Sequence, residues 1–512
     1  MRFVSVITIA TAIACISAET NDRQVDGIIR APIIRNPNVN LLEVAKRRYQ
    51  RLQKRDGGVF NGSLYNDQGS QYLIEVGIGN PAQTFPVTLD TGSADLWVPS
   101  SECPSSSCPF YRFDVSKSSS FKNLEKPFNI QYGIGSVNGT YATDTVTVAG
   151  ASVQNQQFGL ASSTADILQP NPSAGGPGSD TPEPYNSSSS QVEANGILGL
   201  GYPALTQANS QGEGPYYPFV FNLAKQNIIK EPIFSIFLDS ITKQGWSGEI
   251  MFGGIDETRY TGNLSYIPVA GLQSRASALS GNSSSEPQFY YWMVYGQGLG
   301  VNGSTPKTSP HWRLRDVGAY ILDTGTTLTY FPTSVATDIV TAFAGADGFA
   351  LERQAGVFVV DCKVAKSNST FELEMSQSSS FSSTPLVLSV PASELVIPLD
   401  GPTADKATTC MFGIAPMGSS GGVGNNMYLV GDSVLRSAYM VFDMGKNRVG
   451  LATAKDVGGS VSLGARNITF STASRLETPS TESAAMKNAF SWYFSIETKQ
   501  FTKQTLRILG FE

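Results

Sequence analysis

A short pattern that occurs twice constrains the fold of this chain more than any other feature. Residues 85–100 read F-P-V-T-L-D-T-G-S-A-D-L-W-V-P-S, and residues 320–332 read Y-I-L-D-T-G-T-T-L-T-Y-F-P. Each apolar run predicts a buried strand, and the glycine that follows permits a tight turn. Asp90 and Asp323 therefore stand at the ends of two equivalent strands. This repetition predicts two similar lobes that each present one carboxyl to a shared cleft.

The chemistry open to two such carboxyls follows from their charge. Carboxylates in close contact cannot both ionise, so the pair holds one proton. The ionised member can activate a water molecule while the protonated member polarises a carbonyl group. Asp90 and Asp323 are therefore candidates for amide hydrolysis without a metal ion or a nucleophilic side chain. We expect neither a metal nor a cofactor.

The composition favours an all-β fold. The chain has 512 residues, of which 41% are hydrophobic and 15% charged, and it contains 50 glycines. Long helical periodicities are scarce, whereas short apolar runs bounded by polar and glycine-rich segments are common. A chain of this length and composition can bury a large core.

The single histidine limits the alternative mechanisms. A Ser-His-Asp or Cys-His mechanism would have to use His311, which lies in T-S-P-H-W-R-L-R-D, a polar stretch that we interpret as a loop. Zinc sites normally draw on several histidines or cysteines, so the composition also disfavours a zinc enzyme.

The N-terminal 55 residues differ in composition from the rest of the chain. Residues 1–18 carry a basic start, an apolar run and a small-residue end, which predicts a secretory signal peptide. Residues 19–55 hold nine basic and four acidic residues in a chain of net charge −6, and they close on Lys54-Arg55. We interpret them as a basic propeptide that binds the acidic body, loosens in acid and is removed after the dibasic pair. The alternative is a basic arm without an inhibitory role.

Several further segments resemble the pepsin-like aspartic proteases, peptidase family A1, and occur in the order typical of that family. The two Asp-Thr-Gly copies resemble its paired signatures, and the similarity runs unbroken from about residue 70 to 455. The other matching segments are residues 132–136, 195–201, 252–256, 429–432 and 441–443. The resemblance is to the fungal secreted or surface-associated type. It implies an all-β, bilobal pepsin-like fold, with two pseudo-symmetric β-barrel-like lobes and an active-site cleft between them.

The resemblance also implies roles for individual residues. Asp90 and Asp323 would be the catalytic pair. Ser93 and Thr326 would hydrogen-bond the outer carboxylate oxygens, and Thr91 and Thr324 would brace the two loops against each other. The residues that support the dyad are thus Thr91, Gly92, Ser93, Thr324, Gly325 and Thr326.

Residues 129–146 predict a hairpin with a glycine-rich tip, which resembles the flap of the family. Tyr132 and Gly133 would lie at this tip, where the tyrosine can close over a substrate and exclude water. Asp95 and Trp97, which follow the first Asp-Thr-Gly copy, are interpreted as structural.

Four cysteines remain once Cys15 is assigned to the signal segment. From the residues alone, three pairings are open, and free buried thiols are the alternative. Similarity to the family favours the disulfides Cys103–Cys108 and Cys362–Cys410.

The remaining chain divides into three predicted parts. Residues 56–240 would form the N-terminal lobe with the first Asp and the flap, and residues 241–456 the C-terminal lobe with the second Asp. Residues 457–512 form a Ser/Thr-rich tail that we expect to be disordered and that lacks a lipid-anchor signal. N-glycosylation sequons begin at Asn61, Asn138, Asn186, Asn263, Asn282, Asn302, Asn368 and Asn467.

The prediction is an aspartic-type endopeptidase, made as a secreted zymogen and active at acidic pH. Its partners would be peptide and protein substrates, its own propeptide as inhibitor and a dibasic-processing protease. We expect a monomer. We expect no nucleic-acid binding, because the body of the protein is acidic. Location at the cell surface, in the cell wall or in the vacuole is the alternative to secretion. Preference for basic or for large apolar side chains at the scissile bond stays open.

Two other functions compete with this prediction. A catalytically silent pepsin-fold protein could bind peptides or proteins, but both aspartates, both glycines and Tyr132 are present. Residues 323–329 faintly resemble the aspartyl-phosphate motifs of P-type ATPases. A phosphotransferase would need neither the second Asp-Thr-Gly nor a secretory signal.

Overall fold

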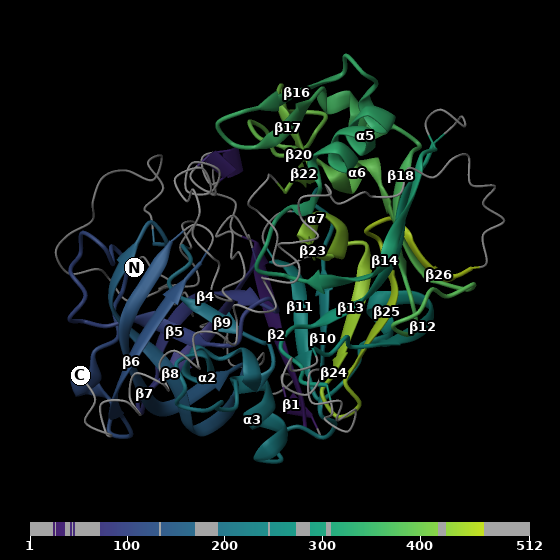
Figure 1. Cartoon of the computed structure of the whole chain (residues 1–512). Helices are drawn as coiled ribbons and strands as arrows, with labels where there is room; N and C mark the ends of the chain where they lie inside the picture. Colours follow the sequence, from purple (N-terminus) through teal and green to yellow (C-terminus); the bar gives the residue numbers. More distant parts are fainter. Residues whose placement is uncertain are drawn as a thin grey trace, which may run out of the picture.

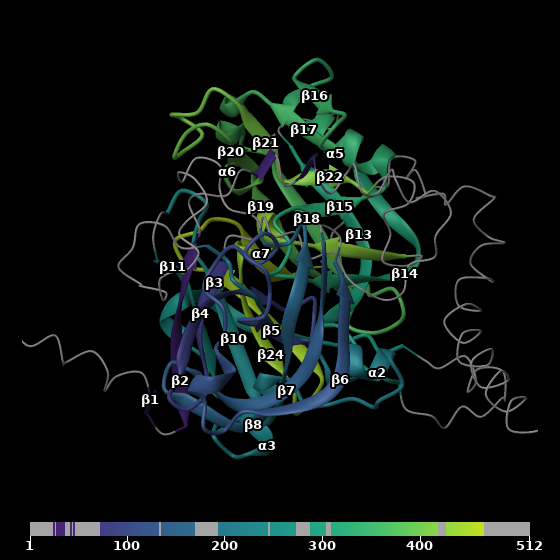
Figure 2. The same ribbon diagram turned by 90° about the vertical axis from the view of Figure 1, so that its left-hand side faces the viewer.

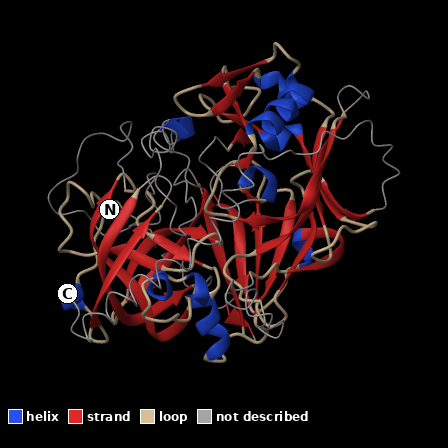
Figure 3. Ribbon diagram, in the orientation of Figure 1, coloured by secondary structure: helices blue, strands red, loops and turns tan. Residues whose placement is uncertain are grey.

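The computed structural model describes residues 24–25, 27–35, 41–42, 45–46, 72–132, 135–168, 193–243, 246–272, 287–303, 309–417 and 426–464. These residues form mainly β-strands with a few short helices, which confirms the predicted all-β class (Figure 3). The predicted signal peptide and residues 465–512 of the predicted tail lie outside the described residues. In the part of the chain that is described, no helix is both long and apolar enough to cross a lipid bilayer.

A 14-stranded sheet contains strands from both halves of the chain (Figure 1). Along its main path the strands lie in the order β12-β25-β24-β10-β11-β2-β3-β4-β9-β5-β8-β7-β6, and β1 pairs with β2. These strands are β1 (Gln24–Val25), β2 (Ile28–Arg35), β3 (Tyr72–Ile78), β4 (Gln83–Asp90), β5 (Leu96–Pro99), β6 (Lys122–Gln131), β7 (Ser136–Val148), β8 (Ala151–Ala165), β9 (Ile197–Gly199), β10 (Ile233–Leu238), β11 (Trp246–Phe252), β12 (Tyr260–Pro268), β24 (Ala438–Asp443) and β25 (Arg448–Ala454).

Two smaller sheets complete the second half of the chain. The eight-stranded sheet has the order β22-β15-β23-β14-β13-β18-β19-β26, and the four-stranded sheet the order β16-β17-β21-β20. Their strands are β13 (Met293–Asn302), β14 (His311–Leu322), β15 (Thr329–Phe331), β16 (Phe349–Glu352), β17 (Val357–Val360), β18 (Thr370–Met375), β19 (Leu386–Pro391), β20 (Val396–Pro398), β21 (Cys410–Phe412), β22 (Ile414–Pro416), β23 (Met427–Val430) and β26 (Ser460–Leu463).

Short helices connect the strands. The α-helices are α2 (Gln207–Ser210), α3 (Phe219–Lys225), α5 (Thr333–Ala344), α6 (Ala392–Leu395) and α7 (Asp432–Leu435). The 3₁₀ helices are η1 (Val115–Lys117), η3 (Pro203–Leu205), η4 (Glu257–Arg259) and η6 (Cys362–Lys366). The longest, α5, buries one apolar face, which includes Val335, Ile339 and Phe343, against the second-half core.

The repeated sequence pattern folds into the same strand arrangement twice. In the first copy, β4 runs parallel to β9, and β5 runs antiparallel to β9. In the second copy, β14 runs parallel to β23, and β15 runs antiparallel to β23. Each Asp-Thr-Gly turn therefore connects two strands that flank a third strand from much later in the chain. Because all three strands are largely apolar, their burial holds both turns in equivalent positions.

Strand β2, from the predicted propeptide, lies in the middle of the large sheet. It pairs with β11 on one side and with β3 on the other, as Figure 2 also shows. Ile29, Ala31 and Ile33 alternate along β2 and are buried in the core. Further along the same segment, Leu41 and Ala45 are buried in a second apolar cluster with residues of the second half. The predicted propeptide is thus integrated into the fold of this form of the chain.

Some sequence-based expectations differ from the structure. His311 is not in a loop but begins β14, where it pairs with Gly300. The predicted tail is not disordered at its start, because β26 pairs with β19. The lobe boundary predicted between residues 240 and 241 is not among these differences: it falls in the turn that connects β10 and β11, and it stays a prediction.

The structure contains the two disulfides that the family resemblance implied. Cys103–Cys108 closes a short loop after β5, and Cys362–Cys410 joins η6 to β21. All four cysteines are buried, so both bonds lie within packed regions of their lobes.

Candidate active site

The carboxyls of Asp90 and Asp323 adjoin each other where the two repeated turns meet. Asp90 ends β4, Asp323 directly follows β14, and each is only 1% exposed. A Cβ atom added to Gly92 would lie 2.5 Å from Asp323 Oδ1, and one added to Gly325 would lie 2.4 Å from Asp90 Oδ1. Each turn therefore needs glycine, because any side chain there would collide with the carboxyl from the other half.

The first carboxyl is held by donors from its own turn. The backbone N–H of Gly92 donates to Asp90 Oδ1 at 2.8 Å, and Ser93 Oγ donates to Asp90 Oδ2 at 2.5 Å. Hydrogen bonds of this kind favour the ionised form of a carboxyl. They also fix the direction in which the oxygens of Asp90 point.

The second carboxyl has equivalent donors but a strongly altered acidity. Gly325 N–H donates to Asp323 Oδ1 and Thr326 Oγ1 donates to Asp323 Oδ2, both at 2.8 Å. Burial and the charge of the adjoining Asp90 nevertheless hold the pKa of Asp323 well above its usual range. A pair of this kind carries one proton between its members over a wide pH range.

The two turns are braced directly against each other by threonines. Thr91 N–H donates to Thr324 Oγ1 at 3.2 Å, and Thr324 N–H donates to Thr91 Oγ1 at 3.0 Å. The two hydroxyls donate onward to the backbone, Thr91 to Leu322 O at 2.6 Å and Thr324 to Leu89 O at 3.0 Å. This reciprocal contact is the arrangement that the family resemblance implied for the pair.

Tyr132 is buried beside the first Asp-Thr-Gly turn. Trp97 Nε1 donates to the Tyr132 hydroxyl at 3.0 Å, which leaves the hydroxyl proton free to donate elsewhere. Burial, together with the charges of Asp95 and Asp90, raises the pKa of Tyr132 well above its usual value, so the proton is retained. The Tyr132 backbone N–H bonds to Gly135 O at 2.7 Å. The other predicted tip residue, Gly133, lies outside the described residues.

Asp95, which we interpreted as structural, connects three separate elements. Its Oδ1 accepts from the hydroxyls of Tyr141 on β7 and Tyr216 before α3, at 2.7 and 2.8 Å. Its Oδ2 accepts from the Gln207 N–H of α2 at 2.8 Å. Burial raises the pKa of Asp95, although these hydrogen bonds oppose the shift. No local pattern in the sequence indicated that either tyrosine would contact Asp95.

His311 lies apart from these residues. Its Nε2 is 3.3 Å from Glu374 Oε1 of β18, and within the described ranges its ring has no hydrogen bond to a serine or a cysteine. Across the same ranges, no group of three or more His, Cys, Asp or Glu side chains is arranged to hold a metal ion.

A salt bridge from the predicted propeptide was not foreseen from the sequence. Arg30 Nη1 of β2 lies 2.5 Å from Asp256 Oδ2 and 3.4 Å from Glu249 Oε1. The excess of basic residues in residues 19–55 indicated contact with the acidic body but not these partners.

Four of the predicted glycosylation sites are described, and all four side chains are exposed: Asn138, Asn263, Asn302 and Asn368. Asn61, Asn186, Asn282 and Asn467 lie outside the described residues.

Two adjoining carboxyls with hydroxyl donors behind each can divide the roles of general base and general acid in amide hydrolysis. Together with the bilobal β fold, this arrangement defines the class of protein as an aspartic protease. A sequence model of the family described as eukaryotic aspartyl protease matches residues 71–454. The chain therefore belongs to this family, and with it to the aspartic-type endopeptidases among the hydrolases.

Individual relatives agree with this assignment. The chain is 33% identical to mucorpepsin of Rhizomucor pusillus over 399 residues, which are 78% of this chain and 82% of the relative. It is 32% identical to chymosin of Camelus dromedarius over 402 residues, 78% of this chain and 84% of the relative. It is 30% identical to gastricsin of Homo sapiens over 387 residues, 75% of this chain and 81% of the relative.

Proposed function

We propose that this chain is an endopeptidase with an acidic pH optimum, in which Asp90 and Asp323 activate one water molecule between them. The observation that carries the proposal is the contact between the two buried carboxyls, whose approach requires glycine at both Gly92 and Gly325. Members of such a pair share one proton, and acid preserves that state.

The reaction follows from the protonation of the pair. The ionised Asp90 takes a proton from the water, whose oxygen attacks the carbonyl carbon of the scissile peptide bond. Asp323, kept protonated by burial and by Asp90, gives its proton to the carbonyl oxygen, which yields a tetrahedral gem-diol. Asp90 then returns the proton to the nitrogen, the C–N bond breaks, and a gem-diol proton restores Asp323.

Tyr132 would exclude water from this reaction when a substrate is bound. Its hydroxyl accepts from Trp97 and still has a proton to donate to the substrate. Gly133 would provide the backbone freedom that a closing hairpin tip needs.

Residues 19–55 would act as the propeptide of a zymogen. The support is the position of β2 between β11 and β3 and the contact of Arg30 with Asp256. Burial would raise the pKa of Asp256, but hydrogen bonds from Thr258 and Arg30 outweigh it and lower the pKa. A carboxyl with a lowered pKa stabilises the folded state above its unfolded value of about 4 and loses that contribution as the pH falls through its folded value. Acid would therefore loosen the propeptide.

The chain would be secreted, with residues 1–18 removed on export, cleavage after Lys54-Arg55 and glycans at a subset of the exposed sequons. N-terminal sequencing of the secreted protein tests this route, because it should find a mature chain that begins at Asp56. Glycosidase treatment should also lower its apparent mass.

Digestion of an acid-denatured protein tests the catalytic proposal. Wild-type protein at about pH 3 to 5 should cut internal peptide bonds, and a statine-type inhibitor should block the cleavage. Asp90→Asn and Asp323→Asn should each abolish it, whereas Asp405→Asn, at an exposed ion pair with Lys366, should retain it. Full activity of Asp90→Asn would refute the assignment of the pair.

A further inference from the structure

We propose that Glu394 and Arg436, a buried ion pair in the second half of the chain, are positioning residues for the Asp323 turn, and that the balance of their charges sets the pH range of hydrolysis. The inference rests on the proposed endopeptidase function and concerns the same site. The pair would act through the elements that carry it.

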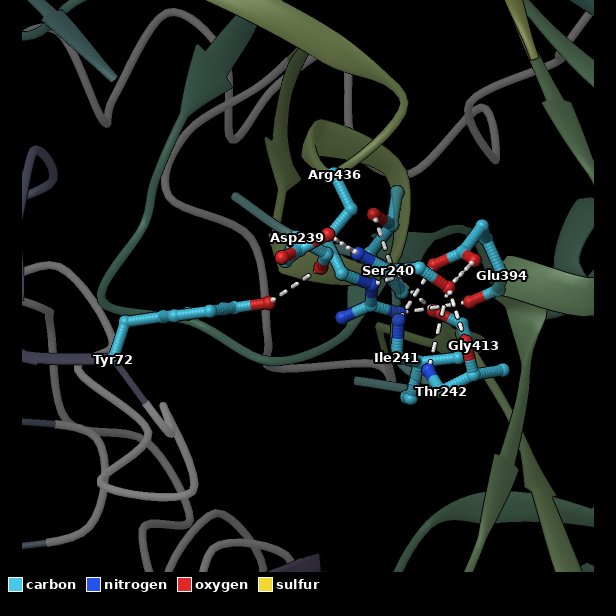
Figure 4. A network of polar contacts seen from close by, with 10 residues as sticks. Tyr72, Asp239, Ser240, Ile241, Thr242, Glu394, Gly413 and Arg436 are labelled. Atoms are coloured by element: carbon cyan, nitrogen blue, oxygen red, sulfur yellow. Dashed lines mark hydrogen bonds and ion pairs between the residues drawn. The ribbon is translucent and has the colours of Figure 1, made fainter. Parts of the chain in front are cut away.

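The ion pair is fully enclosed and makes several contacts (Figure 4). Arg436, which directly follows α7, donates from Nε to Glu394 Oε2 at 3.0 Å and from Nη2 to Glu394 O at 2.8 Å. The two side chains are only 3% and 1% exposed. Removing one partner of such a pair would leave an uncompensated buried charge, which is strongly unfavourable.

The carboxylate of Glu394 also holds the turn between β10 and β11. Ser240 Oγ donates to Glu394 Oε1 at 2.6 Å, and Ile241 N–H donates to Glu394 Oε2 at 3.1 Å. Figure 4 shows Ser240 and Ile241 beside the carboxylate of Glu394. The pair therefore ties the large sheet to α6 and α7.

Helix α7 connects Arg436 to the second catalytic turn. At its start, Asp432 N–H donates to Thr326 O at 2.8 Å and Ser433 N–H donates to Thr327 O at 3.0 Å. Thr326 in turn donates its hydroxyl to Asp323. A shift of Arg436 would thus move the four-residue helix α7. The start of α7 holds Thr326, and Thr326 orients the carboxyl of Asp323.

A second connection runs through Glu394. The next residue, Leu395, accepts through its carbonyl from Gly413 N–H at 2.6 Å. Gly413 O accepts from Thr329 N–H at 3.0 Å and from Ser433 Oγ at 2.7 Å. Both members of the ion pair are therefore linked by hydrogen bonds to the segment that follows the second Asp-Thr-Gly copy.

The first catalytic turn has a different environment at the equivalent place. Arg436 stands five residues after Gly431, and the residue five positions after Gly199 is Ala204. The charged pair is thus specific to the second repeat, which also carries the carboxyl with the raised pKa.

The charged and titratable groups that face the guanidinium come from three elements. They are Tyr72 of β3, Glu394 of α6 and Asp432 of α7, and Asp239 lies nearby with its carboxyl bonded to Ser240 N–H at 3.2 Å. Burial alone would lower the pKa of Arg436, but Tyr72, Glu394 and Asp432 outweigh it and raise the pKa. Arg436 therefore remains charged throughout the working range, and the charge of Glu394 is the variable that a substitution can remove.

Glu394→Gln removes that charge and keeps the contacts. The amide oxygen at the Oε2 position would still accept from Arg436 and Ile241. The amide nitrogen at the Oε1 position would donate to Ser240 Oγ, whose own proton can turn to Thr242 Oγ1 at 3.0 Å. The variant should therefore fold, with Asp432 still facing the guanidinium, and it raises the net charge behind the Asp323 turn by one.

The experiment compares the pH profile of kcat/KM for wild type and Glu394→Gln on one peptide substrate. An added positive charge favours the ionised forms of the dyad. The acidic and the basic limb of the pH profile should therefore both move to lower pH by about 0.5 to 1 unit. This is the scale of one charge that acts at an effective dielectric constant of about 20. Asp405→Asn is the matched control. It makes the same charge change in the exposed pair with Lys366 and should leave both limbs in place.

Two further variants separate charge from position. Glu394→Asp keeps the charge but shortens the reach, so kcat should fall several-fold while both limbs stay in place. The double variant Glu394→Gln with Arg436→Met removes both charges and should return the limbs to the wild-type pH with a lowered kcat. Thermal unfolding of each variant identifies any that does not fold, and Glu394→Asp alone still tests the positioning role.

Limbs that stay at the wild-type pH in Glu394→Gln would overturn the role of the charge, and an undiminished kcat in Glu394→Asp would overturn the positioning role. The pH dependence of statine-type inhibitor binding provides a readout without turnover and should shift in the same direction. A wild-type protein that neither cleaves nor binds the inhibitor would instead refute the proposed function, and this inference with it.

Discussion

Thr91 and Thr324 exchange hydrogen bonds across the junction of the two repeats, each backbone N–H donating to the other's hydroxyl oxygen at 3.2 and 3.0 Å. These hydrogen bonds fix the two turns against each other. Since each threonine also donates to a backbone carbonyl, neither hydroxyl can be removed without leaving buried polar groups unpaired.

Thr324→Val should therefore cost both stability and activity. The valine fills the same volume but leaves Thr91 N–H and Leu89 O without their partner, which should lower the free energy of unfolding by about 2 to 4 kcal/mol. Urea denaturation measures this change, and kcat should fall as the carboxyls lose their register. Thr337→Val, on helix α5, is the control, because its hydroxyl bonds only to the preceding turn of its helix. Equal effects of the two variants would contradict the bracing role.

Gly92→Ala should abolish activity. The new methyl group would lie 2.5 Å from Asp323 Oδ1, so the two turns must separate to accept it. A peptide-cleavage assay should detect no turnover, while circular dichroism still reports a folded β protein. Gly464→Ala serves as the control, since a Cβ atom there has no neighbour within 4 Å. Wild-type turnover in Gly92→Ala would show that the carboxyls work at a greater separation than the structure gives.

The raised pKa of Asp323 predicts a specific dependence of stability on pH. Because the folded state keeps a proton that the unfolded state releases near pH 4, this group makes stability fall as the pH rises from about 4 toward the folded pKa. Asp323→Asn should remove that decline. The free energy of unfolding of the variant minus that of wild type should therefore increase between about pH 4 and 7. Chemical denaturation across this range measures it. A difference that does not vary with pH would argue against a raised pKa.

Asp95→Asn should destabilise the first half of the chain. The carboxylate accepts three hydrogen bonds, and an amide cannot reproduce them, because its NH₂ group would either face the Gln207 N–H or require both tyrosine hydroxyls to accept where they now donate. We expect a loss of about 1 to 3 kcal/mol in the free energy of unfolding. Asp114→Asn, at a partly exposed carboxyl, provides the comparison. If both variants unfold at the same denaturant concentration, Asp95 is not the anchor of this network.

Arg30→Gln should let the zymogen convert at higher pH. The substitution removes the cation that contacts Asp256 and Glu249, so less acid is needed to release β2. Gel electrophoresis after incubation at stepped pH should detect cleavage of residues 19–55 at about one unit above the wild-type threshold. Lys366→Gln, which breaks the exposed pair with Asp405, should convert like wild type. An unchanged threshold in Arg30→Gln would remove this contact from the activation mechanism.

Much of the fold could be predicted because its signals are local. Apolar runs that end in Asp-Thr-Gly predict a buried strand and a turn wherever they occur, and two copies predict two equivalent turns. The failures have local causes as well. The polar residues around His311 suggested a loop. In the structure this segment is part of β14, which pairs with β13 and buries alternating residues. The local sequence does not predict this pairing. The Ser-rich residues after 457 suggested disorder, yet residues 460–463 pair with β19.

The sequence by itself determined that two aspartates end two equivalent buried strands, because strand burial and turn formation depend on neighbouring residues. Only the tertiary structure decided which distant groups complete the site. Tyr216 reaches Asp95 from 121 residues away, and Arg436 meets Glu394 across 42 residues. The hydrogen-bond partner of a buried polar group comes from whichever segment the packing of the whole chain brings within reach. The residues that neighbour the group in sequence therefore do not predict its partner.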